Sequence, residues 1–186
     1  MFVRLDTGEP LTVEEHHARV ASAVLHPNVP DDVRSYFITI QNLCIYAWFA
    51  YDLYPVVQFL CCAAIEMALR MKFPLQGRDR RGLKTLLSEA VSKKLIKAKG
   101  FSHMRALRQT QAEQLRMDRH IFKLAGPPFA KAGSPIPKTD YGEILAQAVP
   151  FLRNAFAHPR KHAIIMPGEA LMQLQITSEF INQLFV

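Results

Sequence analysis

The chain has 186 residues, of which 49% are hydrophobic and 21% are charged. A chain of this length and composition forms one domain with a sizeable core, which excludes a disordered protein. The formal net charge is +7, and the positive charge is concentrated in residues 72–123, which hold 14 Lys and Arg against 4 Asp and Glu. A surface of this sign suits an anionic partner such as nucleic acid, although solvated, lysine-rich helices explain the same charge.

The N-terminus, the cysteines and the longest apolar run indicate a cytoplasmic protein. An acidic residue, Asp6, follows close on the N-terminus, which is unlike a secretory signal peptide. Three cysteines in apolar surroundings, without a CxxC pair or a zinc spacing, are expected to be reduced thiols: Cys44, Cys61 and Cys62. Residues 35–65 carry Asp52 as their only charge, but Pro55 and several polar residues interrupt the run. We therefore predict two buried helices joined near Asp52 and no membrane span.

Three helices are predicted in the first part of the chain. Thr12 and Glu15 form a capping-box pattern that begins a helix over residues 12–25. Acidic residues favour the start of a second helix over residues 31–50. The third helix, residues 55–72, begins with a proline, which suits the first helical position, and is apolar nearly all round. A helix of that kind is expected in the middle of a bundle.

Helical periodicity continues in the second part of the chain. The predicted helices cover residues 83–96, 102–124, 140–158 and 169–185, and a proline-rich loop covers residues 126–138. No alternating pattern typical of a β-strand occurs. The sequence therefore predicts an all-α, antiparallel helical bundle of about six or seven helices.

The end of the predicted helix 140–158 carries three polar residues of the kind used to bind and cleave a phosphodiester. Arg153 is a cation, Asn154 is an amide, and His158 titrates near neutrality. At about 100° per residue, Asn154 and His158 share a side opposite the core face, and Arg153 lies on the flank. The core face is predicted to hold Leu145, Ala148, Val149, Leu152 and Phe156. The alternative is a helix C-terminus at which Arg and His only compensate the helix dipole and cap carbonyls.

Glu66 is the only acidic residue of the third predicted helix. A buried carboxylate needs a partner, because an unpaired charge removed from water costs several kcal/mol. We predict Arg153 as this partner, and the alternative is Arg70, one helical turn further on. Two adjacent histidines in the first predicted helix, His16 and His17, are expected at the surface.

Residues 153–158, with the sequence Arg-Asn-Ala-Phe-Ala-His, resemble the motif of the HEPN superfamily, an Arg often followed by a polar residue and, four to six residues on, a His. The helix over residues 55–73, with Glu66, looks like the earlier HEPN helix that often carries a glutamate. The last predicted helix is similar in position to the last helix of the family. The resemblance covers residues 31–186, so residues 1–30 are predicted to be an N-terminal helical extension of one compact unit.

The resemblance implies an all-α bundle that dimerises and brings two motifs together in one composite cleft. Many HEPN proteins are metal-independent endoribonucleases of toxin–antitoxin, abortive-infection or CRISPR-linked defence systems, and others only bind RNA, nucleotides or proteins. By position, Arg153 and His158 carry the catalytic pair of the family, and Asn154 is the supporting polar residue. HEPN toxins with a nucleotidyltransferase antitoxin tend to have a tyrosine two residues after the histidine, where this chain has Arg160.

The resulting hypothesis is a HEPN-type endoribonuclease that acts in a toxin or defence context without a metal ion or other cofactor. The residues expected to hold RNA are Arg78, Arg80, Arg81, Lys84, Arg105, Arg108, Arg160 and Lys161. The expected partners are RNA, a second copy of the chain, and a cognate antitoxin or neighbouring gene product. The alternative is a catalytically inactive HEPN-type module that binds RNA or protein. A duplex-DNA-binding protein is a further alternative, for which no recognition-helix pattern is found.

Overall fold

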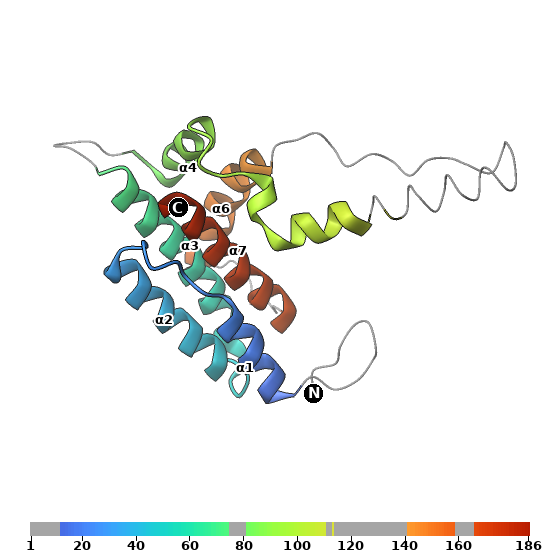
Figure 1. Cartoon of the computed structure of the whole chain (residues 1–186). Helices are drawn as coiled ribbons and strands as arrows, with labels where there is room; N and C mark the ends of the chain where they lie inside the picture. The colour runs from blue at the N-terminus through green and yellow to red at the C-terminus, as the bar shows by residue number, and fades with distance from the viewer. Residues whose placement is uncertain (1–11, 75–80, 111–112, 114–140, 159–165) are drawn as a thin grey trace, which may run out of the picture.

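The computed structural model describes residues 12–74, 81–110, 113, 141–158 and 166–186. Within these residues every regular element is helical (Figure 1), which confirms the predicted all-α bundle. The α-helices are α1 (Val13–Ser22), α2 (Asp31–Tyr46), α3 (Tyr54–Lys72), α4 (Leu83–Ser92), α6 (Tyr141–Ala157) and α7 (Pro167–Phe185). Two short 3-10 helices are η1 (Tyr51–Leu53) and η2 (Ala98–Gly100), and residues 102–110 are also helical.

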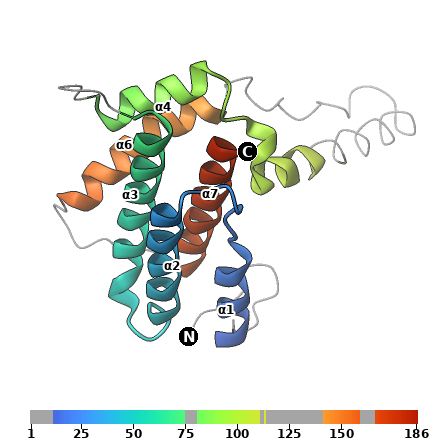
Figure 2. The same cartoon turned by 60° about the vertical axis from the view of Figure 1, so that its left-hand side comes forward.

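Helices α3 and α7 form the centre of the bundle, where they make the most extensive helix–helix contact. Helices α1 and α2 pack on one side of this pair, and α4 and α6 pack together against α3 on the other (Figures 1 and 2). Cys61, Ile65 and Leu69 of α3 are fully buried, as are Leu174 and Ile181 of α7. Each such aliphatic side chain stabilises the fold by roughly 1.5–3 kcal/mol relative to exposure.

The apolar run at residues 35–65 forms two helices, α2 and α3, joined at η1 beside Asp52, as predicted. By length and composition alone, Tyr51–Lys72 is the described stretch that is long and apolar enough to cross a membrane. In the bundle α3 packs against α2, α4, α6 and α7, and many of its side chains are buried there. Helix α3 is therefore a central helix of the bundle.

The predicted helix starts are more accurate than the predicted ends. The capping box is present: the Glu15 amide donates to Thr12 Oγ1 at 3.2 Å, and the Thr12 amide donates to Glu15 Oε2 at 3.1 Å. Helix α1 nevertheless ends at Ser22 rather than near residue 25, and Gln41 Nε2 of α2 caps this end by donating to the backbone carbonyls of Val20 and Ala23 at 3.1 Å each. Such side-chain contacts between helices are not visible in the periodicity of either helix.

Helix α4 also ends early, at Ser92 instead of residue 96. Lys94 follows with a positive φ of 57°, a conformation that ends a helix. The amide of Leu95 donates back to the carbonyl of Ala90 at 3.0 Å and satisfies one of the last carbonyls of α4.

The prediction that His16 lies at the surface is wrong. The His16 side chain is fully buried, whereas His17 is exposed. Its Nε2 atom lies 2.9 Å from the carbonyl oxygen of Cys44, one of the last four carbonyls of α2. The ring packs on Trp48, with 5.3 Å between ring centroids, and edge-on to Tyr54 at 6.2 Å. Helix α1 therefore shares the core of residues 31–186.

Candidate functional site

Helix α6 lies at the outside of the bundle (Figure 2), where it packs against α3 and α4. Leu145 and Val149 of the predicted core face are buried, and Ala148, Leu152 and Phe156 are half-buried. The opposite side is open to solvent. Because α6 ends at Ala157, Arg153 and Asn154 lie in its last turns and His158 directly follows them.

Asn154 and His158 lie on the open side of α6, as predicted, and both are exposed. The backbone amide of His158 donates to the Asn154 carbonyl at 3.0 Å, which fixes the chain direction at this end of the helix. In the part of the chain that the structure describes, no side-chain hydrogen bond is formed by His158 or Asn154. The dipole alternative also expects side-chain bonds to the last carbonyls, and neither Arg153 nor His158 makes one with a described residue.

Glu66 of α3 is the acidic residue nearest this site, but it does not pair mainly with Arg153. Its Oε1 atom accepts two hydrogen bonds from Arg70, from Nε at 3.1 Å and Nη2 at 2.7 Å. Its Oε2 atom lies 3.9 Å from Nε of Arg153, at the limit of an ion pair. The Glu66 side chain is 21% exposed and so is partly buried, and Arg70 is its closer partner, whereas the predicted pair with Arg153 is the longer of the two.

This geometry leaves the guanidinium of Arg153 largely available. The Arg153 side chain is 40% exposed, and its terminal amino groups have no hydrogen-bond partner among the described residues. Two cations, Arg70 and Arg153, share the single charge of Glu66. An excess positive charge with free N–H donors suits a phosphate oxygen.

The cysteine beneath Arg153 is not a nucleophile. Burial raises the pKa of Cys62 to about 12, and the nearby charge of Arg153 only partly offsets this effect. A thiol with this pKa is protonated at neutral pH. Cys44 and Cys61 are likewise free and buried, which agrees with the predicted reduced core thiols.

An apolar stripe on α6, which the sequence did not single out, borders the same open side. Phe151 is 72% exposed and Ile144 is 45% exposed, and both line an open depression of about 430 Å³ with Gln147 and Ala148. The sequence does contain a pattern that could have revealed this stripe. Its members are apolar and lie four, three and four residues apart: Ile144, Ala148, Phe151 and Ala155. Large exposed apolar side chains in a row are typical of an interaction surface.

The described residues predicted to hold RNA lie in two separate places. Arg105 and Arg108 are exposed on the 102–110 helix, beside the start of α6, where Tyr141 packs on Phe101 at 4.9 Å between ring centroids. Helix α6 has 17 residues, so its motif end lies roughly 25 Å away, on the opposite side of the bundle in Figure 2.

The other predicted RNA-binding residues lie on or near α4. Arg81 forms an ion pair with Glu89, which also binds Lys93, whereas Lys84 faces α6. Four further predicted contacts lie outside the described residues: Arg78, Arg80, Arg160 and Lys161. Of the described set, Lys84 is therefore the unpaired cation on the α6 side of the bundle.

No cluster of three or more His, Cys, Asp or Glu side chains that could hold a metal ion occurs in the described ranges. Comparisons of the chain with models of known families, with curated protein sequences and with solved structures give no match. The similarity to the HEPN superfamily therefore depends on the residues quoted above, and the structure establishes a helical bundle with a polar motif at the open end of α6.

Proposed function

We propose that the chain is a HEPN-type, metal-independent endoribonuclease whose site consists of Arg153, Asn154 and His158. The observation that carries the proposal is their placement. Asn154 and His158 project from the open side of α6, beside an arginine whose terminal amino groups are unpaired among the described residues. Side chains that only pack in the core or cap the helix end do not need to be exposed together with unpaired polar groups.

The chemistry requires a nucleophile, a proton carrier and charge stabilisation. The 2′-oxygen of the RNA attacks the adjacent phosphorus, the bond to the 5′-oxygen breaks, and a 2′,3′-cyclic phosphate and a 5′-hydroxyl are formed. His158 accepts the 2′-hydroxyl proton or donates a proton to the leaving 5′-oxygen. Arg153 stabilises the extra negative charge on the phosphorane, and Asn154 donates an amide N–H to the substrate.

A second copy of the chain is part of the proposal. The exposed Ile144 and Phe151 lie on the flank of the motif, and covering them with the same stripe of another copy buries apolar surface on both sides. Asn154 and His158 lie next to this stripe on α6. Such a dimer therefore brings two motifs close together, so that one copy supplies the proton acceptor and the other the proton donor.

The test is cleavage of single-stranded RNA by purified protein in the presence of EDTA. We expect His158→Ala and Arg153→Ala to lower the rate by about 10²–10⁴-fold, the range for loss of a general acid–base group or of an oxyanion donor. His17→Ala, which removes another exposed histidine, should cleave like the wild type. Equal cleavage by all variants rejects the site. Binding of RNA without cleavage supports the inactive binding module instead.

The biological setting is proposed on the same basis. We expect a cytoplasmic toxin or defence protein that is controlled by an antitoxin or neighbouring gene product. Expression in a bacterial host should then arrest growth, and His158→Ala should relieve the arrest. Arrest that persists in the variant contradicts a role for RNA cleavage in toxicity.

A further inference from the structure

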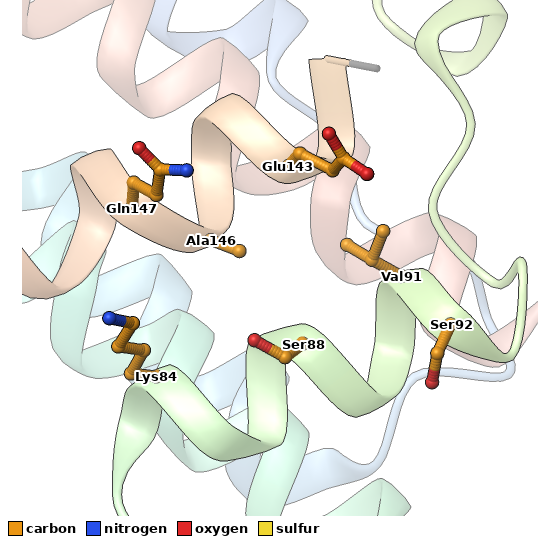
Figure 3. A pocket seen from close by; sticks show the side chains of 7 residues that line it. All are labelled: Lys84, Ser88, Val91, Ser92, Glu143, Ala146 and Gln147. Atoms are coloured by element: carbon orange, nitrogen blue, oxygen red, sulfur yellow. The ribbon is translucent and has the colours of Figure 1, made fainter. Parts of the chain in front are cut away.

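A groove of about 570 Å³ with polar and apolar lining residues lies between α4 and α6 (Figure 3). The two helices run antiparallel, so that Lys84 faces Gln147 at one end and Ser92 lies near Glu143 at the other. Val91 lines the groove at the Glu143 end and Ala146 lines its middle, and both are apolar.

Four polar side chains that line this groove are exposed and have no partner among the described residues. Lys84, Ser88, Glu143 and Gln147 form no hydrogen bond or ion pair with any residue that the structure describes, although all four line the same space. A fifth polar residue of the groove, Ser92, donates its Oγ hydrogen to the Glu89 carbonyl at 2.9 Å. A concave site with several free polar groups is what a polar ligand requires.

A cation, an apolar surface and a carboxylate follow one another along the groove, in the order that suits the phosphate, sugar and base of a nucleotide. The Lys84 ammonium attracts a phosphate at one end. Glu143 at the other end accepts hydrogen bonds only, so it suits the amino group of adenine, cytosine or guanine. Uracil has no amino group, and the N3–H donor on its pairing edge lies between two carbonyl oxygens that the carboxylate repels, so its binding is expected to be weaker. Val91 and Ala146 offer apolar surface to a sugar or base between these ends.

The groove also lies beside the motif. At about 100° per residue, Glu143, Gln147, Asn154 and His158 fall within about 40° of one direction on α6. Gln147 precedes Asn154 by seven residues, which is roughly 10 Å along the helix. The end of the groove with Lys84 and Gln147 is therefore the end nearer to the motif. The apolar stripe lies on the other flank of α6, away from α4.

We propose that the α4–α6 groove binds one nucleotide of single-stranded RNA next to the cleaved phosphate. Lys84 holds the phosphate of that nucleotide, and Glu143 selects a base with an amino group. This inference rests on the proposed nuclease function, because it assigns a substrate subsite beside Arg153 and His158.

Binding of short 2′-O-methyl oligonucleotides, which cannot form the cyclic phosphate, tests the groove separately from cleavage. Fluorescence anisotropy should show tighter binding of adenine and cytosine oligonucleotides than of uracil oligonucleotides. Lys84→Ala should weaken all of them by about tenfold and lower the slope of log K against log salt by about one. Glu143→Gln should remove the preference over uracil. The matched controls are Lys97→Ala and Glu169→Gln, exposed residues outside the groove.

The outcomes separate the two proposals. If Lys84→Ala weakens binding no more than Lys97→Ala, and Glu143→Gln keeps the base order, the groove is not a subsite, whatever His158→Ala does to cleavage. If the groove variants change binding as expected but unmodified RNA is not cleaved, the subsite stands and the nuclease is rejected. If no oligonucleotide binds to the wild type, the groove is not a subsite, and cleavage of unmodified RNA alone decides the nuclease proposal.

Discussion

Glu66 on α3 and Arg153 on α6 lie opposite each other, with Oε2 of the glutamate 3.9 Å from Nε of the arginine. The same carboxylate binds Arg70 more closely, at 2.7 Å. All three side chains are partly exposed, and ion pairs of this kind contribute about 0–1 kcal/mol to stability. The arrangement therefore orients Arg153 more than it stabilises the fold.

We expect Glu66→Gln to lower RNA cleavage severalfold while changing the free energy of unfolding by less than about 1 kcal/mol. The neutral amide no longer attracts the Arg153 guanidinium, which then samples more orientations. Arg70→Ala is the matched control, because it removes the closer partner of Glu66 and keeps the ion pair between Glu66 and Arg153. Cleavage rates and urea unfolding of both variants are measured. An equal loss of cleavage in both contradicts a role through Arg153.

Phe151→Asp is expected to convert the proposed dimer to a monomer and to reduce cleavage with it. The substitution places a charge in the middle of the apolar stripe, and two such charges face each other across a twofold interface. Phe49→Asp is the control, because Phe49 is 76% exposed but lies after α2, away from α6. Sedimentation velocity gives the oligomeric state. A Phe151→Asp protein with the mass of the wild type rejects this interface.

The buried His16 should make the protein less stable in acid. Its Nε2 faces a carbonyl oxygen and therefore carries the proton, whereas its Nδ1 has no hydrogen-bond partner in the described part of the chain. Burial lowers the pKa of His16 in the folded state, and the charges of Arg19 and His17 lower it further, against a smaller opposing effect of the Cys44 carbonyl. In the unfolded chain the pKa is about 6.5.

Acid lowers the stability because the folded and unfolded chains bind the His16 proton differently. Below about pH 6.5 the unfolded chain binds a proton that folded His16 does not, so stability falls by up to about 1.4 kcal/mol per pH unit until the lowered pKa is reached. Above pH 6.5 this contribution is constant. Urea unfolding between pH 5 and 7.5 measures it. His16→Gln keeps an N–H donor and should flatten the profile, whereas His17→Gln should not. A His16→Gln profile as steep as that of the wild type contradicts this assignment.

Gly100→Ala and Gly168→Ala should change stability in opposite directions. A Cβ atom at Gly100 would collide with the end of the Gln183 side chain and displace the amide oxygen that accepts the hydrogen bond of the Lys97 amide at 2.7 Å. We expect a loss of roughly 1 kcal/mol. At Gly168, in the first turn of α7, a Cβ atom meets no atom of the described residues within 4 Å, and alanine should stabilise by about 0.5–1 kcal/mol. Thermal unfolding compares the two, and equal signs would contradict the geometry at Gly100.

The sequence predicted the local features of the candidate site. Helical periodicity placed Asn154 and His158 outside the core, and the structure has both exposed on α6. It also predicted a joint near Asp52 and the capping box at Thr12, because caps and turns depend on residues close together in the chain. Caps and turns can therefore be recognised from one sequence.

The sequence by itself determined which stretches are helical and which side of each helix is apolar, since these properties repeat within a few residues. Only the tertiary structure decided which helices face each other. In the structure His16 is buried against the end of α2. Glu66 pairs more closely with Arg70 than with Arg153, and Lys84 lies opposite Gln147 across a groove. The periodicity of one helix does not specify the helix that covers it, so contacts between distant segments depend on how the whole core packs.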